Sequence, residues 1–264
     1  MKVLLINPNS SFDLYKEVGG NLPPMGLAYL ASVLQNQGHT VTIRDLEVEP
    51  SDNLEFDQYD LLGIGSLTPQ FNNAIKVARE AKKENLPVVM GSYHPTFMDQ
   101  EALETGVVDY IVRGEGEYIM EDLVNTLEQA GKPEDVKGVS YMKNGSVIRT
   151  PAAPFIRDLD NLPLPARDLL PLDKYDITIE NHKAASVISS RGCPFNCSFC
   201  SSSIFGGLKW RSRSPESLTE EIKHLKQQYG YQAFYFMDDN FTLRPGRVIR
   251  FADNIIREIE EATG

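Results

Sequence analysis

Residues 59–92, YDLLGIGSLTPQFNNAIKVAREAKKENLPVVMGS, contain an apolar strand, a helix and a second apolar strand in succession. LLGIG is a short apolar run that ends at turn-forming residues, as a strand buried on both faces does. FNNAIKVAREAKK spaces its apolar residues three and four positions apart, which is typical of an amphipathic helix. VVMG is another short apolar run. Two such strands joined by a helix form one unit of a parallel sheet.

The same alternation extends on both sides of this unit, from residue 2 to residue 131. Strands are predicted at 2–6, 39–46, 59–66, 87–92 and 108–114, and helices at 25–37, 71–85, 99–106 and 117–131. Five apolar strands that alternate with helices predict a doubly wound parallel sheet. The expected strand order is 2-1-3-4-5, which is flavodoxin-like, and ligands of such sheets bind beyond the carboxyl ends of the strands.

Four of the predicted strands end in loops of small and turn-forming residues, which would let the backbone approach a flat or bulky ligand. The loops are NPNS at 7–10, GIGSLTP at 63–69, GSYHPT at 91–96 and RGEGE at 113–117. Glycines are also ordinary in strand-to-helix turns, so any one loop is a weak signal. A GxGxxG fingerprint is absent after the first strand, which argues against a dinucleotide. His94, taken alone, is interpreted as a hydrogen-bonded loop histidine.

The composition is that of an acidic protein long enough for two modest domains. The chain has 264 residues, with 37 acidic and 26 basic side chains and a formal charge of −11. Because this charge repels phosphate backbones, no nucleic-acid partner is expected. The N-terminal MKVLLINPNS is too short for a signal peptide or a membrane span. We therefore expect a cytoplasmic protein with no membrane span.

Two segments without the strand-and-helix alternation follow. Residues 138–150, GVSYMKNGSVIRT, predict a β-hairpin in which Asn144 and Gly145 form a type I′ turn. Residues 151–176, PAAPFIRDLDNLPLPARDLLPLDKYD, are rich in proline and have no sustained period. Their leucine, isoleucine and phenylalanine side chains indicate burial, so we interpret this segment as an ordered connector between two domains.

A second series of strands and helices begins after the connector. Strands are predicted at 185–189 and 232–242, and helices at 214–230, with a serine N-cap and a terminal glycine, and at 247–264. Between the first strand and the first helix lies RGCPFNCSFC, residues 191–200. A loop that directly follows a strand is where α/β barrels and open sheets carry their chemistry.

This loop holds Cys193, Cys197 and Cys200, the only cysteines in the chain. An odd, clustered set is a poor disulfide framework and suits a metal or redox site. Three thiolates on one loop can bind three corners of a cubane iron–sulfur cluster and leave one iron open. Zinc would need a fourth protein ligand, for which His182 and His224 lack the local spacing. The spacing favours a cluster over zinc, and either over three free thiols.

The C-x3-C-x-aromatic-C loop, with a strand before it, resembles the radical SAM superfamily. The resemblance implies that the three cysteines hold a [4Fe-4S] cluster whose open iron is chelated by S-adenosylmethionine (SAM). Electron transfer then cleaves SAM to methionine and a 5′-deoxyadenosyl radical. The resemblance also puts Phe199 beside the adenine, and Asp238 and Asp239 near the SAM amino group. Capping of the following helix is an alternative role for either aspartate.

The first half of the chain extends the resemblance. GSYHPTF at 91–97, VDYIVRGEGE at 108–117 and DLDNLPLPARDLL at 158–170 resemble the cobalamin-binding subclass of radical SAM enzymes. This implies that the loops of the first sheet bind a corrinoid. The residues concerned are Pro8, Asn9, Gly65, Ser66, Thr68, Gly91, Ser92, His94, Pro95, Gly114, Glu115 and Gly116. The first loop lacks the D-x-H-x-x-G motif that donates a histidine to cobalt, so cobalamin is expected to bind without one.

Taken with the resemblance, the pattern predicts an α/β protein of three parts. These are a flavodoxin-like cobalamin-binding domain at 1–135, a hairpin and proline-rich connector at 136–183, and the first part of a radical SAM (β/α) partial barrel at 184–264. Barrels of this family have more βα units than the two found here. We therefore expect an incomplete barrel and a chain that is inactive alone.

The implied activity is radical abstraction of hydrogen from an unactivated carbon of a small molecule, with cobalamin delivering a methyl group. A reductant such as flavodoxin or ferredoxin is the implied protein partner. Two alternatives stay open. One is a radical SAM oxidative cyclase related to the anaerobic magnesium-protoporphyrin monomethyl ester cyclase, and the other is a non-catalytic corrinoid carrier with a structural metal loop.

Overall fold

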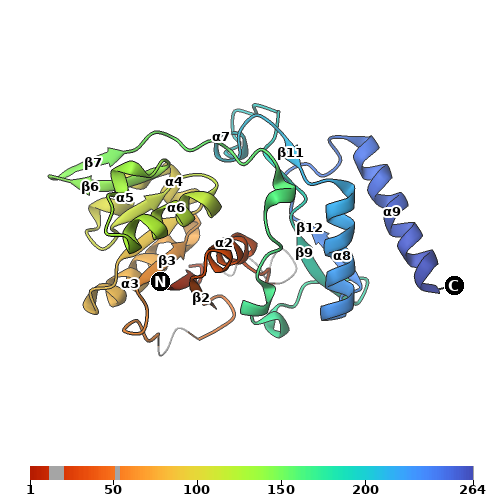
Figure 1. The fold of residues 1–264 in the computed structure, drawn as a ribbon, viewed down its shortest axis with the longest axis horizontal. Helices are drawn as coiled ribbons and strands as arrows, with labels where there is room; N and C mark the ends of the chain where they lie inside the picture. The colour runs from red at the N-terminus through yellow and green to blue at the C-terminus, as the bar shows by residue number, and fades with distance from the viewer. Residues whose placement is uncertain (12–20, 51–53, 264) are drawn as a thin grey trace. The chain divides into compact units, whose positions relative to one another are not determined.

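The structure, a computed structural model, describes residues 1–11, 21–50 and 54–263, and the chain divides into two compact units. Unit 1 comprises Met1–Phe155 and Pro165–Tyr175, and unit 2 comprises Ile156–Leu164 and Asp176–Gly264. Figure 1 shows the helices and strands of both units. In the part of the chain that is described, no helix has the length and apolar content needed to cross a membrane.

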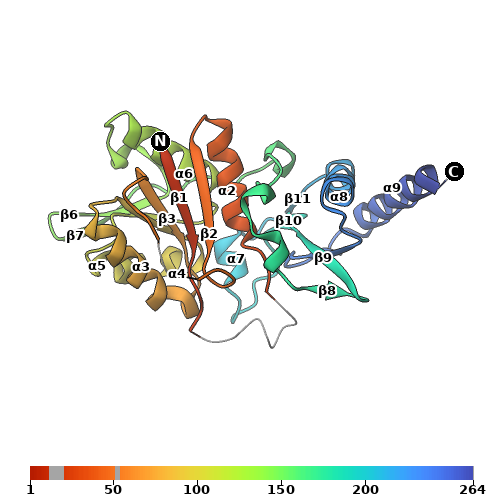
Figure 2. The ribbon, with the colours of Figure 1, turned by 90° about the horizontal axis from the view of Figure 1, so that it is seen from below.

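Unit 1 is built on one seven-stranded sheet. Its parallel strands are β1 (Lys2–Asn7), β2 (Thr40–Asp45), β3 (Leu61–Gly65), β4 (Val88–Gly91) and β5 (Tyr110–Val112). The order β2-β1-β3-β4-β5 confirms the predicted 2-1-3-4-5 topology. β1 lies between β2 and β3, as Figure 2 shows. The strand order therefore reverses at β1, and the loops after β1 and β3 stand at the topological switch point.

The two faces of this sheet are covered by different helices. The helices are α2 (Met25–Asn36) and α6 (Gly116–Glu128) on one face, and α3 (Phe71–Lys83), α4 (Tyr93–Phe97) and α5 (Asp99–Glu104) on the other. Val3 and Leu5 of β1 belong to the core beneath α2 and α6, whereas Leu4 and Ile6 belong to the core beneath α3. Burial of alternate residues on opposite faces explains why the strand is one continuous apolar run.

The predicted hairpin is present and is joined to the same sheet. β6 (Val139–Lys143) pairs antiparallel with β5, and β7 (Ser146–Arg149) pairs with β6. Asn144 and Gly145 have φ values of 52° and 76°, as a type I′ turn requires. The prediction of this turn is therefore confirmed, and the hairpin extends the parallel sheet by two antiparallel strands.

A buried carboxylate fastens the hairpin to α5. Asp99 accepts hydrogen bonds from Arg149 Nε at 2.7 Å and Nη2 at 2.8 Å, and from Ser140 Oγ at 2.7 Å. Burial alone would raise the pKa of Asp99, but the hydrogen bonds from Arg149 and Ser140 hold it below its ordinary value. The planar guanidinium fork matches the two carboxylate oxygens, which makes this pair strong for its position.

Replacing Arg149 by leucine is expected to destabilise unit 1 by about 2 kcal/mol, because a buried carboxylate loses its charged partner. The pKa of Asp99 lies below its ordinary value of 3.8, so the stability it contributes is present above that pH and is lost as the pH falls. Urea denaturation at pH 7 and at pH 3 should therefore show a smaller difference between variant and wild type at pH 3. An equal difference at both pH values would contradict this account.

The proline-rich connector is ordered through three short 3-10 turns, η3 (Leu159–Asn161), η4 (Arg167–Leu169) and η5 (Leu172–Lys174). Its expected apolar burial holds for Ile156, Leu159 and Leu170, but it is wrong for Phe155 and Leu164, which are each 42% exposed. The residues from 165 to 175 pack on unit 1, where the backbone N–H of Ala166 donates to the carbonyl of Ala28. The segment therefore contributes to both units rather than lying between them.

Unit 2 contains two small sheets and three helices. The sheets are β12 (Ala233–Phe236), β9 (His182–Val187) and β8 (Thr178–Ile179) in that order, and the pair β10 (Ser190–Arg191) and β11 (Arg211–Ser212). The helices are α7 (Ser202–Phe205), α8 (Pro215–Tyr229) and α9 (Pro245–Thr263). β12 and β9 are parallel, and β12 lies at the edge of its sheet.

The ends of α8 are those predicted from the sequence. The Ser214 hydroxyl accepts a hydrogen bond from the Ser217 N–H, and Gly230 ends the helix at a φ of 71°. The strand expected at 185–189 begins earlier, at His182, because β8 pairs antiparallel with its first residues. The core of this unit is formed by β9, α8, β12 and α9, and it includes Val187, Leu218 and Leu225.

Candidate functional site

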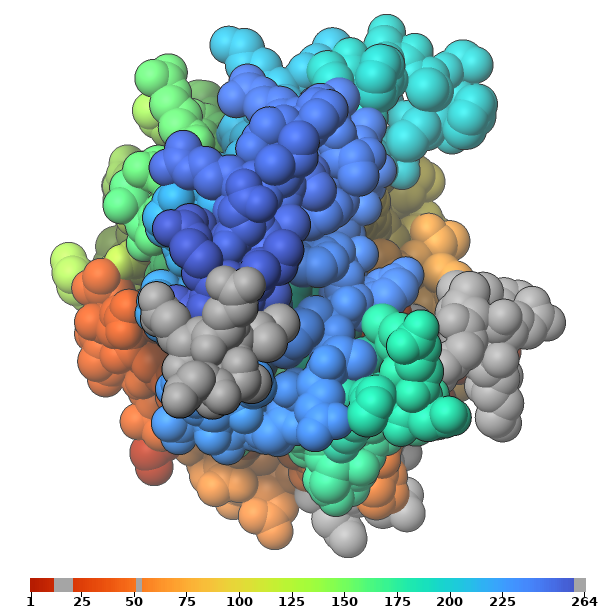
Figure 3. All heavy atoms as spheres, turned by 90° about the vertical axis from the view of Figure 1, so that its right-hand side faces the viewer, coloured from red at the N-terminus to blue at the C-terminus, as the bar shows by residue number. Residues whose placement is uncertain are grey.

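The cysteine loop of unit 2 leaves and returns through a short antiparallel ladder. Ser190 pairs with Ser212 and Arg191 with Arg211, so the chain between them forms a closed loop just beyond the carboxyl end of β9. The segment that carries the cysteines projects at the upper right of the space-filling view in Figure 3. The cysteines therefore lie at the strand end where the sequence predicts them.

Gly192 lies so close to the main chain of residues 206–209, on the returning part of the loop, that only glycine fits there. Its φ is +77°, and a Cβ there would lie 2.6 Å from the carbonyl oxygen of Lys209 and 2.7 Å from that of Gly206. The next N–H, of Cys193, donates to the carbonyl of Gly207 at 3.2 Å. The sequence analysis missed this role, although a glycine directly before the first cysteine is a visible signal.

The three thiols are chemically suited to a cluster. Cys193 and Cys200 are half-buried, Cys197 is exposed, and all three are free. Among the described residues, no three ligand side chains converge on a point where one metal ion could sit. A cubane cluster does not need such convergence, because each thiolate binds a different iron. The donor set therefore fits the cluster, and the assignment of these ligands stays a prediction.

The same loop exposes large apolar side chains. Phe199 is 91% exposed, and Phe195, Ile204 and Leu208 are 54%, 71% and 52% exposed. Apolar side chains gathered on one exposed segment are typical of a surface that binds something. The two histidines considered for zinc lie elsewhere in unit 2, His182 at the start of β9 and His224 in α8, where its ring packs against Tyr229.

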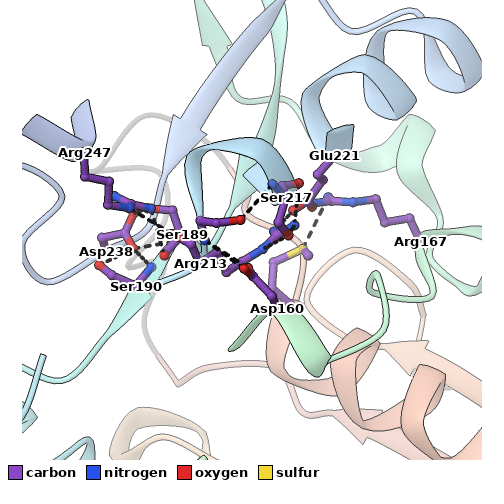
Figure 4. A network of polar contacts seen from close by, with 11 residues as sticks. Asp160, Arg167, Ser189, Ser190, Arg213, Ser217, Glu221, Asp238 and Arg247 are labelled. Atoms are coloured by element: carbon purple, nitrogen blue, oxygen red, sulfur yellow. Dashed lines mark hydrogen bonds and ion pairs between the residues drawn. The ribbon is translucent and has the colours of Figure 1, made fainter. Parts of the chain in front are cut away.

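The two aspartates after β12 have different surroundings. Asp238 accepts hydrogen bonds from the N–H and hydroxyl groups of Ser189 and Ser190, as Figure 4 shows. Burial raises the pKa of Asp238, against the effect of these hydrogen bonds. Asp239 is exposed and accepts one hydrogen bond from the Ser202 hydroxyl at 3.1 Å. The alternative of helix capping is wrong for both, because α9 begins only at Pro245.

An arginine that the sequence analysis did not single out, Arg247, contacts the main chain at Ser189. Arg247 donates from Nη2 to the carbonyl of Ser189 and from Nε to the carbonyl of Arg213, each at 3.0 Å. Its guanidinium carbon lies 5.6 Å from the centroid of the Trp210 ring and 5.5 Å from that of Phe241. Nothing in the local sequence marks Arg247, because its partners are distant along the chain.

In unit 1, the four predicted loops are joined to one another at the carboxyl edge of the sheet. The Ser66 N–H donates to the Gly91 carbonyl, and the His94 N–H donates to the Ser66 carbonyl. The Gly114 N–H donates to the Thr96 hydroxyl, which links the loop after β5 to the turn after β4. Of the cobalamin candidates in this edge, Ser66, His94, Pro95 and Glu115 are buried, Gly65, Gly91, Ser92, Gly114 and Gly116 are half-buried, and Thr68 is exposed.

The loop after β1 joins the same edge through Gln70. The Gln70 amide donates to the Pro8 carbonyl at 2.9 Å and to the Asn7 side chain at 3.1 Å. Asn9 is exposed, and its carbonyl accepts a hydrogen bond from the Asn73 side chain. The predicted site residues Pro8 and Asn9 are therefore brought to the other loops, and Gln70 is a site-forming residue that the sequence analysis missed.

The loop predicted at 91–96 contains a short helix and a strained residue. Ser92 has φ 81° and ψ −166°, a region that is nearly restricted to glycine, and α4 begins at the next residue. Such strain persists only where the surroundings impose it, and it gathers at binding sites. The interpretation of GSYHPT as an irregular loop is wrong from Tyr93 onward.

His94 is held tightly within this turn. Its ring lies 4.1 Å from that of Phe71, centroid to centroid, and its Nδ1 lies 3.2 Å from the Thr68 hydroxyl. Nε2 is buried without a hydrogen bond, at 3.7 Å from the Glu101 carboxylate. Burial lowers the pKa of His94, and Glu101 opposes the shift. The interpretation as a hydrogen-bonded histidine is confirmed, although the residue lies in a helix.

His94→Gln is expected to destabilise unit 1 by about 1 kcal/mol at pH 8, because the stacked ring is lost. The folded-state pKa of His94 lies below its ordinary value of 6.5, so on acidification the unfolded chain takes up the proton first. Wild-type stability should therefore fall as the pH is lowered through 6.5. The difference in melting temperature between wild type and variant, here called the gap, should narrow. Thermal melts between pH 8 and pH 5 measure this gap, and a gap that widens on acidification would contradict it.

Comparison with known proteins assigns both halves of the chain. The family model for the B12 binding domain matches residues 13–124, and the model for the radical SAM superfamily matches residues 187–263. An uncharacterized methyltransferase of Pyrococcus horikoshii is 40% identical, over 98% of this chain and 58% of that protein. The anaerobic magnesium-protoporphyrin IX monomethyl ester cyclase of Rubrivivax gelatinosus is 35% identical, over 97% of this chain and 48% of that protein. The hopanoid C-3 methylase of Methylococcus capsulatus is 30% identical, over 98% of this chain and 50% of that protein.

Solved structures show the same fold. The cobalamin-dependent SAM radical enzyme OxsB aligns with a TM-score of 0.77 and 22% identity, over 97% of this chain and 37% of that chain. The radical SAM methyltransferase TsrM of Kitasatospora setae aligns with a TM-score of 0.73 and 21% identity, over 98% of this chain and 51% of that chain. The chain spans about half the length of the curated relatives it matches. With a B12 binding domain in its first half and a radical SAM domain in its second, the chain belongs to the cobalamin-binding radical SAM family.

Proposed function

We propose that this protein is a cobalamin-dependent radical SAM methyltransferase that acts on an unactivated carbon of a small-molecule substrate. The observation that carries the proposal is the presence of both family domains in one chain, with three free thiols on the loop that follows β9. Methyltransferases are found among its relatives at 40% and 30% identity. We assign residues 1–135 to cobalamin, 136–183 to the hairpin and connector, and 184–264 to the radical SAM domain.

The roles proposed for individual residues follow from their positions. Cys193, Cys197 and Cys200 bind a [4Fe-4S] cluster, Phe199 supplies an apolar face for the adenine of SAM, and the exposed carboxylate of Asp239 faces its amino group. When bound, the cluster and SAM supply the radical chemistry and cobalamin supplies the methyl group. The protein's part is to hold these groups in place and to exclude water and oxygen. The free thiols suit a reducing compartment such as the cytoplasm, and a flavodoxin or ferredoxin is the proposed electron donor.

Cobalamin is proposed to lie on the carboxyl edge of the unit 1 sheet without a protein nitrogen on cobalt. The residues proposed to contact it are Pro8, Asn9, Gly65, Ser66, Thr68, Gly91, Ser92, His94, Pro95, Gly114, Glu115 and Gly116. The one histidine among them, His94, has its ring stacked on Phe71 and its Nδ1 beside the Thr68 hydroxyl. Moving it onto a metal would break both contacts. The glycines and the strained Ser92 let the main chain approach a flat ring closely.

A second candidate function is an oxidative cyclase that uses the same radical. The 35% identity to the magnesium-protoporphyrin monomethyl ester cyclase of Rubrivivax gelatinosus, over 97% of this chain, favours it. The two reactions differ in their products. Methyl transfer adds one methyl group to the substrate and converts a second SAM to S-adenosylhomocysteine, whereas cyclisation changes the substrate mass without that by-product.

The test is anaerobic reconstitution with iron, sulfide and cobalamin, followed by reaction with SAM that carries a deuterated methyl group and a strong reductant. Formation of both 5′-deoxyadenosine and S-adenosylhomocysteine supports a methyltransferase, and 5′-deoxyadenosine alone supports the cyclase. Cobalamin binding without a cluster whose electron paramagnetic resonance spectrum responds to SAM would overturn both in favour of a corrinoid carrier. Nitrogen hyperfine structure on cob(II)alamin that disappears in His94→Ala would contradict histidine-free binding.

A further inference from the structure

The base of the cysteine loop is held by side chains that come from β12 and α9. Ser189 and Ser190 lie between β9 and the loop, and they are 0% and 4% exposed. Ser190 begins the two-residue ladder through which the loop departs, and Arg213 follows the strand through which it returns. The N–H of Arg213 donates to the carbonyl of Ser189 at 2.9 Å, which closes the loop at its narrowest point.

The carboxylate of Asp238 accepts four hydrogen bonds from the base of the loop. Oδ1 accepts from the N–H of Ser189 at 3.0 Å and from the N–H and hydroxyl of Ser190, and Oδ2 accepts from the hydroxyl of Ser189 at 3.0 Å. Oδ1 thus carries three donors and Oδ2 one, and every one of these donors belongs to the two serines at the base of the loop. The side chain therefore joins the end of β12 to the residues from which the cysteine loop starts.

Arg247 contacts the same place. We call the residues that meet there, Ser189, Ser190, Arg213, Asp238 and Arg247, the corner. Arg247 donates to the Ser189 and Arg213 carbonyls, which belong to the departing and returning segments of the loop. Burial lowers the pKa of Arg247, and the attraction of Asp238 opposes that shift, so the two side chains interact electrostatically. Figure 4 shows Asp238 and Arg247 beside each other, next to Ser189 and Ser190.

We infer that Asp238 and Arg247 are positioning residues that fix the base of the cysteine loop, and that the Asp238 carboxylate serves the protein's own donors instead of the SAM amino group. The inference rests on the proposed function only in naming the loop as the cluster site. It assigns the neighbouring, exposed Asp239 as the aspartate that remains available to a ligand. Two residues that follow the same strand thus have separate tasks.

Two substitutions at Asp238 separate these roles. Asparagine keeps an oxygen for both N–H groups, and its amide can donate to the Ser189 hydroxyl, which is able to accept. Asp238→Asn should therefore preserve the corner although it removes the charge. Asp238→Ala removes every acceptor. Asp253→Asn, on an exposed position of α9, is the matched control for loss of one carboxylate.

The first measurement is amide hydrogen exchange in the protein without cofactors, with the strands of unit 1 as an internal reference. In Asp238→Ala, exchange at residues 189–191 and 211–213 is expected to be about fivefold faster or more, which corresponds to the loss of one hydrogen bond. Asp238→Asn and Asp253→Asn should exchange close to wild type. Arg247→Lys, which loses the two-carbonyl fork, should accelerate the same two segments, whereas Arg250→Lys should not.

The second measurement is the iron content and the SAM-dependent change in the electron paramagnetic resonance spectrum after reconstitution. Asp238→Ala should retain less iron, while Asp238→Asn should retain iron and bind SAM within about twofold of wild type. Wild-type exchange rates in Asp238→Ala would overturn the inference. So would a preserved corner with more than tenfold weaker SAM binding in Asp238→Asn. Absence of a cluster in the wild type would overturn the proposed function alone, because the exchange result stands without cofactors.

Discussion

Replacing Cys193, Cys197 or Cys200 singly by alanine is expected to abolish SAM cleavage. Each thiolate is proposed to bind its own iron, and the chain has no fourth cysteine that could substitute. The iron and sulfide content should fall to background, and whatever 5′-deoxyadenosine the wild-type chain forms should no longer be detected. Anaerobic liquid chromatography with mass detection measures this product in reconstituted protein, alongside its iron and sulfide content.

Ser198→Ala is the matched control, because Ser198 is an exposed residue of the same loop. It should retain the iron and sulfide of the wild type. Cysteine-to-serine variants offer a harder oxygen ligand and should bind the cluster poorly, between the alanine variants and wild type. Full cluster content in any one alanine variant, or stoichiometric zinc in protein purified without oxygen, would exclude the assignment of these three ligands.

Much of unit 1 could be predicted because its signals are local and repeated. Short apolar runs such as LLGIG at 61–65 alternate with helically spaced segments, and this alternation leaves few topologies for a parallel sheet. Asn144 and Gly145 determine their turn by backbone preference alone. The prediction of a cluster at the three cysteines likewise rests on their spacing and on the strand before them. In each case, the information lies within a few residues along the chain.

The remaining features depend on contacts between distant residues. Ser189 and Arg213 each look like an ordinary polar residue in the sequence, and Asp238 was singled out only as a possible SAM contact. Their meeting follows only from how β9, β11 and β12 are placed. The pairing of β8 with β9 was missed because β8 has two residues, too few for a period. The strain at Ser92 was missed because a serine gives no warning of a backbone conformation that glycine usually adopts.

Arg213 and Glu221 form a buried ion pair in unit 2, next to the base of the cysteine loop. Arg213 Nη1 contacts the Glu221 carboxylate, and the two residues are 6% and 1% exposed. Arg213 also donates to the carbonyl of Ser217 at 3.0 Å and to its hydroxyl. The pair thus connects α8 to the segment on which the cysteine loop returns. Removing one partner would take a close opposite charge away from a buried charged group.

Glu221→Ala is therefore expected to destabilise unit 2 by about 3–5 kcal/mol, because the guanidinium of Arg213 stays buried and loses this carboxylate partner. Urea denaturation followed by the fluorescence of Trp210, the single tryptophan of the chain, reports on unit 2 directly. Circular dichroism should show the transition of unit 1 at its wild-type midpoint. Loss of the pair should also reduce the fraction of protein that retains a cluster, since the returning segment of the loop is no longer held.

Two further variants show whether charge, rather than lost packing, causes this effect. Replacing both partners, Arg213→Met with Glu221→Leu, removes the buried charges together and should recover stability to within about 1 kcal/mol of wild type. Glu216 lies on α8, as Glu221 does. Glu216→Ala breaks its exposed pair with Arg250 of α9 and should leave the midpoint unchanged. If the double variant were as unstable as Glu221→Ala, lost packing would explain the destabilisation. If it recovered stability but not cluster content, the pair would act on the loop through the geometry of Arg213, whose backbone carbonyl binds Arg247.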